Sequence, residues 1–135
     1  MSTEPLLGVA AVVVDDERLL LVRRGSGPAG GWWDLPGARI AARQTIAEAV
    51  VEAVASETGL EAVTGELVGV EERLDGARHE ILLVVHAGLI DDVAPVAGGD
   101  AAEARWHDVA DLGATRFAPG LAEFLHDHGV LSLLT

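Results

Sequence analysis

The 135-residue sequence contains no cysteine, lysine, asparagine or tyrosine. The absence of cysteine excludes disulfides, thiolate metal sites and a cysteine nucleophile. The absence of lysine leaves nine arginines against 22 acidic residues, and the formal net charge is -13. Such an acidic surface repels phosphate backbones, so no nucleic-acid partner is expected. Together with abundant alanine, glycine and valine, these absences favour an origin in a GC-rich bacterial genome.

Long hydrophobic runs and targeting signals are also missing. No apolar run approaches the ~18 residues typical of a membrane span, and the first residues, Met-Ser-Thr-Glu-Pro, lack the segments of a secretory signal. We therefore expect a cytoplasmic protein with no membrane partner. Half of the residues are apolar, as in globular chains. The length suits a single domain over residues 1–135, and a homodimer is compatible with these features.

The first part of the chain predicts two buried strands and a loop. The continuous apolar run 6–14 is typical of a strand buried on both faces, and residues 18–24 read as the returning strand. Residues 25–31 contain four glycines and a proline, which predicts a loop. Residues 32–35 are expected to be extended, because Pro36 disfavours helix at the residue before it.

A helix is the clearest element of the middle of the chain. Thr45 and Glu48 have the spacing of a capping box at its start. Gly59 lies where a left-handed residue ends a helix. The spacing of one buried helical face is followed by Ile46, Ala49, Val50, Ala53 and Val54.

The second half of the chain predicts three strands and a further helix. These elements span residues 67–74, 78–90, 104–107 and 121–128. The Asp75-Gly76 pair between the first two strands is a strong signal for a hairpin turn. The Gly- and Ala-rich stretch 91–102 predicts a loop.

Residues 35–60 carry the most informative pattern: Leu-Pro-Gly-Ala-Arg-Ile, a helical run, then Ser-Glu-Thr-Gly-Leu. The pattern resembles the signature of the Nudix (MutT-like) family, which reads Gly, five residues, Glu, seven residues, Arg-Glu, an aliphatic, any residue, Glu-Glu, any residue, Gly and an aliphatic. Leu-Leu-Leu-Val-Arg-Arg, Trp-Asp-Leu-Pro-Gly and Glu-Ala-Arg-Trp also occur where the family carries similar strings. The resemblance covers nearly the whole chain. It implies an α/β fold, the Nudix-type α/β/α sandwich with a mixed central sheet.

In this register most carboxylates of the motif are replaced. Gln44 stands for the first Glu, Glu52 and Ala53 for the Arg-Glu pair, and Ser56 and Glu57 for the Glu-Glu pair. In family members with the full motif, the helix carboxylates hold Mg²⁺ or Mn²⁺, which neutralises a diphosphate and helps to activate a water. Alanine cannot ligate, and a neutral serine is a poor substitute for a carboxylate. We therefore expect no metal site on this helix.

Two acids are the candidate catalytic residues. Glu57 is either a residual ligand or general base, or a hydrogen-bond acceptor for the backbone of the nearby Gly-rich turn. Glu103 lies in the predicted loop region where some family members carry an additional catalytic glutamate; the alternative is a surface acid. Glu48 and Glu52 share a helix face rotated by about 100° from that of Ala53, so both are expected in solvent.

Three residues are candidates for binding a ligand. Arg24 and Arg39 flank the expected pocket, and arginine suits bidentate contacts with a phosphate or carboxylate; the alternative is surface solubility. Trp32 adjoins the Gly-rich stretch and could stack on a flat ligand. Its neighbour Trp33 is expected in the core.

Three functional hypotheses follow from the resemblance. The favoured one is a Nudix-family protein that lacks ordinary Mg²⁺-dependent hydrolysis of nucleoside diphosphate derivatives and binds or transforms a small molecule. The second is a divergent but active pyrophosphohydrolase, which alone would need Mg²⁺ or Mn²⁺ as a cofactor. The third is a repurposed, metal-independent enzyme of a biosynthetic pathway. Because the chain has only nine arginines against 22 acidic residues, the ligand is expected to be neutral, cationic or at most singly anionic.

Overall fold

The computed structural model describes residues 4–25 and 30–134, so residues 26–29 of the predicted loop 25–31 lie outside the described residues. The strands are β1 (Leu6–Val12), β2 (Val14–Asp15), β3 (Arg18–Arg24), β4 (Trp33–Asp34), β5 (Gly37–Arg39), β6 (Ala62–Asp75), β7 (Arg78–Leu89) and β8 (Ala101–Asp108). The helices are α1 (Ile46–Thr58), α2 (Val109–Leu112) and α3 (Leu121–Asp127), followed by the 3-10 turn η1 (Leu131–Leu134). No helix in these ranges is long and apolar enough to cross a membrane.

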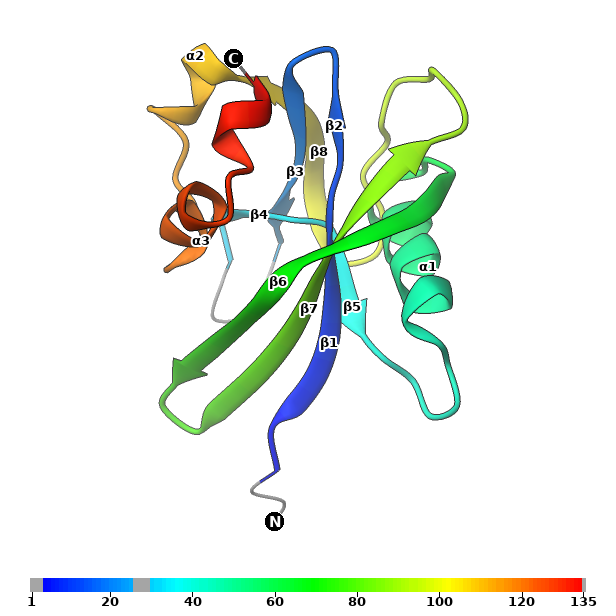
Figure 1. Ribbon diagram of the computed structural model, residues 1–135, viewed down its shortest axis with the longest axis vertical. Coiled ribbons are helices and arrows are strands. Elements are labelled where there is room, and N and C mark those ends of the chain that lie inside the picture. Colours follow the sequence, from blue (N-terminus) through cyan, green and yellow to red (C-terminus); the bar gives the residue numbers. More distant parts are fainter. Residues whose placement is uncertain (1–3, 26–29, 135) are drawn as a thin grey trace.

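Two four-stranded sheets form the middle of the molecule. The first has the order β5-β1-β7-β6, in which β1 and β7 are parallel and the other pairs antiparallel. In the second, β3 pairs antiparallel with β2, β4 and β8. Helix α1 lies on one side of the strands, and α2 and α3 lie on the other (Figure 1). The expected α/β class with a mixed sheet is confirmed.

Strand β1 supplies two hydrophobic cores at once. Val9 and Ala11 belong to the core beneath α1, whereas Ala10 and Val12 belong to the core beneath α3. All four are at most 3% exposed. Because both faces of the strand are covered, its sequence is continuously apolar instead of alternating. The prediction of a strand buried on both faces is confirmed for this part of the apolar run.

Helix α1 begins and ends as the sequence predicts. The Thr45 hydroxyl accepts from the Glu48 N–H at 3.0 Å, and the Glu48 carboxylate accepts from the Thr45 N–H at 2.9 Å. Gly59 ends the helix with φ 72°. Four of the five residues of the predicted face are buried; Ile46 is 44% exposed, because the first three residues of α1 face solvent.

The β6–β7 hairpin is longer than predicted. Strand β6 begins at Ala62, and Asp75 pairs with Arg78, so Gly76 and the residue after it form the turn in place of the predicted Asp75-Gly76. Gly76 has φ 56°, a left-handed value that favours glycine. The last predicted strand is also longer: β8 begins at Ala101, because it pairs with β3 along the whole of that strand.

Candidate functional site

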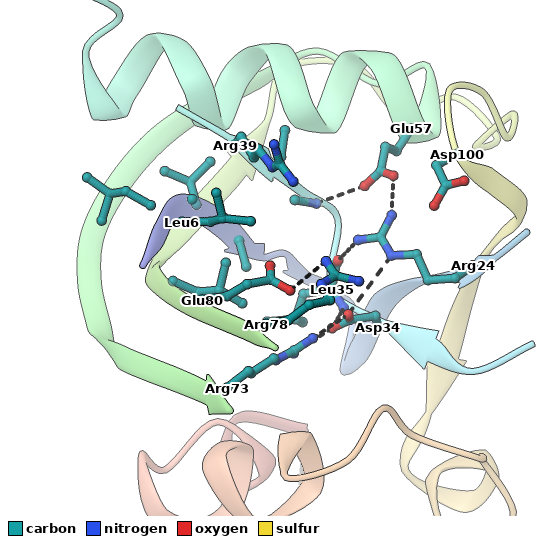
Figure 2. A pocket seen from close by; sticks show the side chains of 17 residues that line it. Leu6, Arg24, Asp34, Leu35, Arg39, Glu57, Arg73, Arg78, Glu80 and Asp100 are labelled. Atoms are coloured by element: carbon teal, nitrogen blue, oxygen red, sulfur yellow. Dashed lines mark hydrogen bonds and ion pairs between the residues drawn. The ribbon is translucent and has the colours of Figure 1, made fainter. Parts of the chain in front are cut away.

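A pocket of about 450 Å³ opens beside β1 and β5, next to the C-terminal half of α1 (Figure 2). Apolar side chains of β1 and β7, among them Leu6 and Leu82, form part of its wall. The charged lining residues are Arg24, Arg39, Arg73, Arg78, Asp34, Glu57, Glu80 and Asp100. Four arginines thus face four acids, and the formal charge of the lining is balanced.

The end of α1 contributes one carboxylate to this pocket. Ala53 is 2% exposed and packed in the protein, Ser56 is exposed, and Glu57 is 5% exposed with its side chain directed towards the pocket. One carboxylate oxygen, Oε1, accepts from the Gly37 N–H at 2.8 Å. The other, Oε2, pairs with Nη1 of Arg24. Both oxygens of Glu57 therefore already have donors from the protein.

Gly37 can reach Glu57 because its backbone lies unusually close to β1. A Cβ at this position would lie 2.6 Å from the Val9 carbonyl oxygen, which is closer than real Cβ contacts. Glycine therefore permits the approach that places the Gly37 N–H below α1. The interpretation of Glu57 as an acceptor for the backbone of the Gly-rich turn agrees with this contact; its interpretation as a general base stays a prediction.

Arg24 is the last residue of β3, and its side chain is 14% exposed. Its Nη2 donates to the Leu35 carbonyl oxygen at 3.0 Å, and its Nε lies 3.9 Å from Oδ2 of Asp34. Successive side chains of a strand point to opposite faces. Accordingly, the preceding Arg23 points away and pairs with Glu103 at 2.9 Å. The structure thus brings Arg24 and Glu57 together in the pocket.

Asp34 joins Arg24 to a second half-buried arginine, Arg73. It accepts from Nη1 and Nη2 of Arg73 at 2.8 and 3.0 Å and from the Leu35 N–H at 2.8 Å. Arg73 also donates to Glu71 at 2.9 Å. Sequence reasoning missed this network. The available signal was Asp34 itself, a lone acid within the apolar string Trp-Asp-Leu; nothing local distinguishes Arg73 or Glu71 from other polar strand residues.

Burial and pairing act in opposite directions on these groups. Burial raises the pKa of Glu57, while the charge of Arg24 and the hydrogen bond from Gly37 oppose that rise. Burial likewise raises the pKa of Glu71 against the charge of Arg73. Burial alone would lower the pKa of Arg73, but its hydrogen bond and charge contacts with Asp34 and Glu71 outweigh burial and raise it. Arg73 is therefore a permanent cation in the pocket wall.

Of the other two predicted ligand-binding residues, Arg39 lines the pocket and Trp32 does not. Arg39, in β5, lines the pocket and is exposed. It has no ion pair within residues 4–25 and 30–134, so its guanidinium is available to a ligand. Trp32 does not line this pocket; it borders an adjoining cavity of about 700 Å³ that shares Arg73 and Glu80 with the first. The Arg116 guanidinium lies 5.1 Å from the Trp32 ring centroid. Trp33 is 9% exposed, as expected of a core residue.

The expectation that Glu103 lies in a loop is wrong. It lies within β8, opposite Arg23, because the ladder between β3 and β8 continues to Ala101. Its carboxylate pairs with Arg23, and it is not among the residues that line the pocket. The prediction that Glu48 and Glu52 face solvent is confirmed. Glu52 accepts a hydrogen bond of 2.9 Å from the Gln44 side chain.

These side chains do not fit a divalent cation on α1. Mg²⁺ needs several oxygen ligands at once, whereas α1 offers Glu57, whose oxygens are held by Arg24 and Gly37. Among the residues that the structure describes, no three His, Cys, Asp or Glu side chains are grouped so that they could hold a metal ion. The arrangement can instead bind a small molecule through charged and apolar walls.

One buried histidine lies outside the pocket. His107, in β8, is 2% exposed, and its ring packs edge-on against Trp33 with 4.6 Å between the centroids. Its Nδ1 lies 3.1 Å from the Arg105 carbonyl oxygen. Burial lowers the pKa of His107; the Arg105 charge acts in the same direction, and the hydrogen bond and the carboxylates of Asp108 and Asp111 oppose it. The neutral ring is therefore the form that suits the fold.

Comparisons with known proteins agree with this fold. A family model described as NUDIX domain matches residues 4–128. An ADP-ribose pyrophosphatase of Methanocaldococcus jannaschii is 31% identical over 109 residues, which are 80% of this chain; the chain spans 64% of that protein's length. A MutT NUDIX hydrolase structure from Burkholderia pseudomallei has a TM-score of 0.80 at 24% identity, covering 91% of this chain and 97% of that one. The NUDIX domain of Shewanella oneidensis NrtR, complexed with ADP ribose, has a TM-score of 0.77 at 20% identity, covering 96% and 89%. Because the family model matches most of its length, the chain belongs to the Nudix family.

Proposed function

We propose that this chain is a Nudix-family protein that binds or transforms a small molecule in the pocket beside β1 and lacks ordinary Mg²⁺-dependent hydrolysis of nucleoside diphosphate derivatives. The proposal rests on one observation, the hydrogen-bond and ion-pair contacts of the Glu57 carboxylate. It is the one carboxylate at the three helix positions that correspond to the motif's ligands, and both of its oxygens have protein donors. A divalent ion would have to displace Arg24 or Gly37 to reach it.

The charges of the pocket support a ligand with at most one negative charge. Arg24 and Arg73 are paired with buried acids, and Arg78 donates to Glu80 at 2.8 Å. Arg39 is therefore the basic lining residue best placed to bind an anionic group of the ligand. A diphosphate carries more negative charge than one arginine offsets, whereas the apolar walls suit an uncharged or singly charged, partly apolar compound.

A second function is supported by the curated relative. The similarity to an ADP-ribose pyrophosphatase favours an active hydrolase that cleaves ADP-ribose or a similar diphosphate with Mg²⁺ or Mn²⁺. A third possibility, metal-independent chemistry on a small molecule, uses the same pocket. The three candidates differ in two measurable properties, metal binding and turnover.

Calorimetric titration with Mg²⁺ and Mn²⁺, followed by a substrate panel that includes ADP-ribose, separates them. The proposal expects no divalent-ion site of millimolar or tighter affinity and no turnover of the panel. A millimolar or tighter site that disappears in Glu57→Gln, together with hydrolysis of ADP-ribose, would establish the second function. Turnover of any compound in metal-free buffer would establish the third.

A thermal-shift screen in metal-free buffer tests the proposed ligand class. A ligand at about 100 times its dissociation constant stabilises a protein by about 2.7 kcal/mol. We expect singly anionic aromatic compounds to raise the melting temperature, and Arg39→Gln to remove most of this rise. Arg43→Gln is the matched control, because Arg43 is exposed and does not line the pocket. Greater stabilisation by nucleoside di- or triphosphates than by these compounds would contradict the charge argument.

The remaining expectations belong to the same proposal. We infer that residues 1–135 form a single Nudix domain, and the match to residues 4–128 supports this. We also propose a cytoplasmic, bacterial protein with no nucleic-acid partner, supported by the composition and the net charge of -13. A homodimer stays a prediction, and sedimentation analysis would test it.

A further inference from the structure

Arg24 lies in a cage of oxygen atoms. Its guanidinium contacts the Glu57 carboxylate and the Leu35 carbonyl oxygen, and it lies 3.9 Å from the Asp34 carboxylate. Two carboxylates and a backbone carbonyl are also the kinds of oxygen ligand that hard divalent cations take in proteins. Figure 2 shows the Arg24 side chain reaching between α1 and the segment that follows β4, with its donors directed at these acceptors.

Arg24 offsets part of the negative charge of the cage and its neighbours. Glu57, Asp34 and Glu71, which also pairs with Arg73, contribute three negative charges, and Arg24 and Arg73 contribute two positive charges. These side chains are at most 20% exposed, so water and salt screen them weakly. A divalent ion bound to the same oxygens would lie beside a guanidinium of like charge, and the repulsion between the two cations would oppose its binding. Arg24 and a divalent ion therefore compete for one place.

We propose that the Arg24 guanidinium is the resident cation of this pocket: it occupies the oxygen cage at the end of α1 in the place of a divalent ion and excludes one. This inference deepens the proposed function and rests on it. A guanidinium carries five N–H donors, and the contacts within the described residues use one N–H of Nη1 and one of Nη2. Unlike a metal ion, this cation cannot be removed by a chelator.

Restoring one ligand, with and without Arg24, tests the inference. Ser56→Glu adds a carboxylate at an exposed position of α1 next to Glu57, and Mn²⁺ is the probe, followed by electron paramagnetic resonance and calorimetry. We expect Ser56→Glu/Arg24→Met to bind Mn²⁺ at least about tenfold more tightly than Ser56→Glu, since juxtaposed like charges cost several kcal/mol and tenfold needs only about 1.4. Ser56→Glu/Arg23→Met is the matched control, because Arg23 points away to Glu103; it should bind like Ser56→Glu.

Affinities of Ser56→Glu and Ser56→Glu/Arg24→Met within about twofold of each other would overturn the inference. If circular dichroism shows that the Arg24 variant does not fold, a measurement on the unmutated chain tests the inference instead. There, Mn²⁺ is titrated into ¹⁵N-labelled protein while the Gly37 amide signal is followed, because that N–H donates to Glu57. An unbroadened Gly37 signal at submillimolar Mn²⁺ supports exclusion, and selective broadening contradicts it.

The experiment also separates the inference from the function on which it rests. Stronger stabilisation by nucleoside diphosphates than by singly anionic compounds in metal-free buffer, combined with a tenfold effect of Arg24→Met, would overturn the ligand class of the proposed function but leave the exclusion of the ion by Arg24 intact. No turnover, combined with no effect of Arg24→Met, would overturn the role of Arg24 alone.

Discussion

Replacing Asp34 by asparagine should destabilise the protein more than any single contact of Asp34 suggests. The side chain is 8% exposed and lies between two guanidiniums, with Arg73 at 2.8 and 3.0 Å and Arg24 at 3.9 Å. Asparagine has nearly the same size and can still accept from the Leu35 N–H. The substitution therefore removes the charge and leaves the shape almost unchanged.

The size of the loss in stability depends on the contacts that Arg73 keeps after the substitution. Breaking a buried ion pair by removing one partner typically costs about 3–5 kcal/mol. Arg73 is 20% exposed and keeps its contact with Glu71 at 2.9 Å, which reduces the penalty. We expect Asp34→Asn to lower the free energy of unfolding by about 2–4 kcal/mol. Arg73→Met alone should also destabilise, and the double variant should lose less than the sum of the two.

Urea denaturation at pH 7, with the midpoint and the slope both measured, gives these free energies. Asp92→Asn is the control, because Asp92 is exposed outside the strands and helices; it should change stability by no more than about 0.5 kcal/mol. A loss below about 1 kcal/mol for Asp34→Asn would refute the reasoning, as would a coupling between Asp34 and Arg73 below the roughly 0.5 kcal/mol typical of interacting pairs.

Three further predictions concern the fold. Leu21→Ala, at a side chain with 0% exposure, should cost about 2–5 kcal/mol in urea denaturation, whereas Leu74→Ala, at 71% exposure, should cost little. Thr45→Ala removes the hydroxyl that accepts from α1 and should lower the free energy of unfolding by about 1 kcal/mol, with a lower melting temperature in calorimetry. Because the folded-state pKa of His107 is lowered from 6.5, its stabilising contribution is present above pH 6.5 and is lost as the pH falls towards the folded value. Melting temperatures between pH 7.5 and 5.5 should fall less in His107→Gln than in the parent, and equal slopes would contradict this.

Local patterns in the sequence were enough to predict the elements that depend on neighbouring residues. The capping box of Thr45 and Glu48 and the left-handed Gly59 are set by contacts within a few residues, and both are confirmed. The hairpin turn was misplaced by one residue, because turn signals identify the region while strand pairing fixes the position. The extra length of β6 could not be predicted, since residues 62–66 carry no regular alternation.

The candidate site was only partly predictable, because its contacts join distant residues. Glu57 and Arg24 were both singled out, but their ion pair spans 33 positions and depends on where β3 ends beside α1. The pair of Asp34 and Arg73 spans 39 positions and gave no signal in either segment alone. Glu103 was misplaced because its stretch is rich in alanine, and the pairing with β3 that makes it a strand is visible only in the fold.

Because β1 packs on both faces, substitutions far from the pocket can alter its shape. Ala10 lines the pocket and also belongs to the core beneath α3, together with Leu121 and Leu125. Protein interiors are tightly packed and transmit small displacements. A substitution at Leu125 can therefore reshape the pocket from behind, without touching a lining residue. Variants selected for binding a new ligand should therefore include substitutions in the core beneath α3, although these residues do not line the pocket.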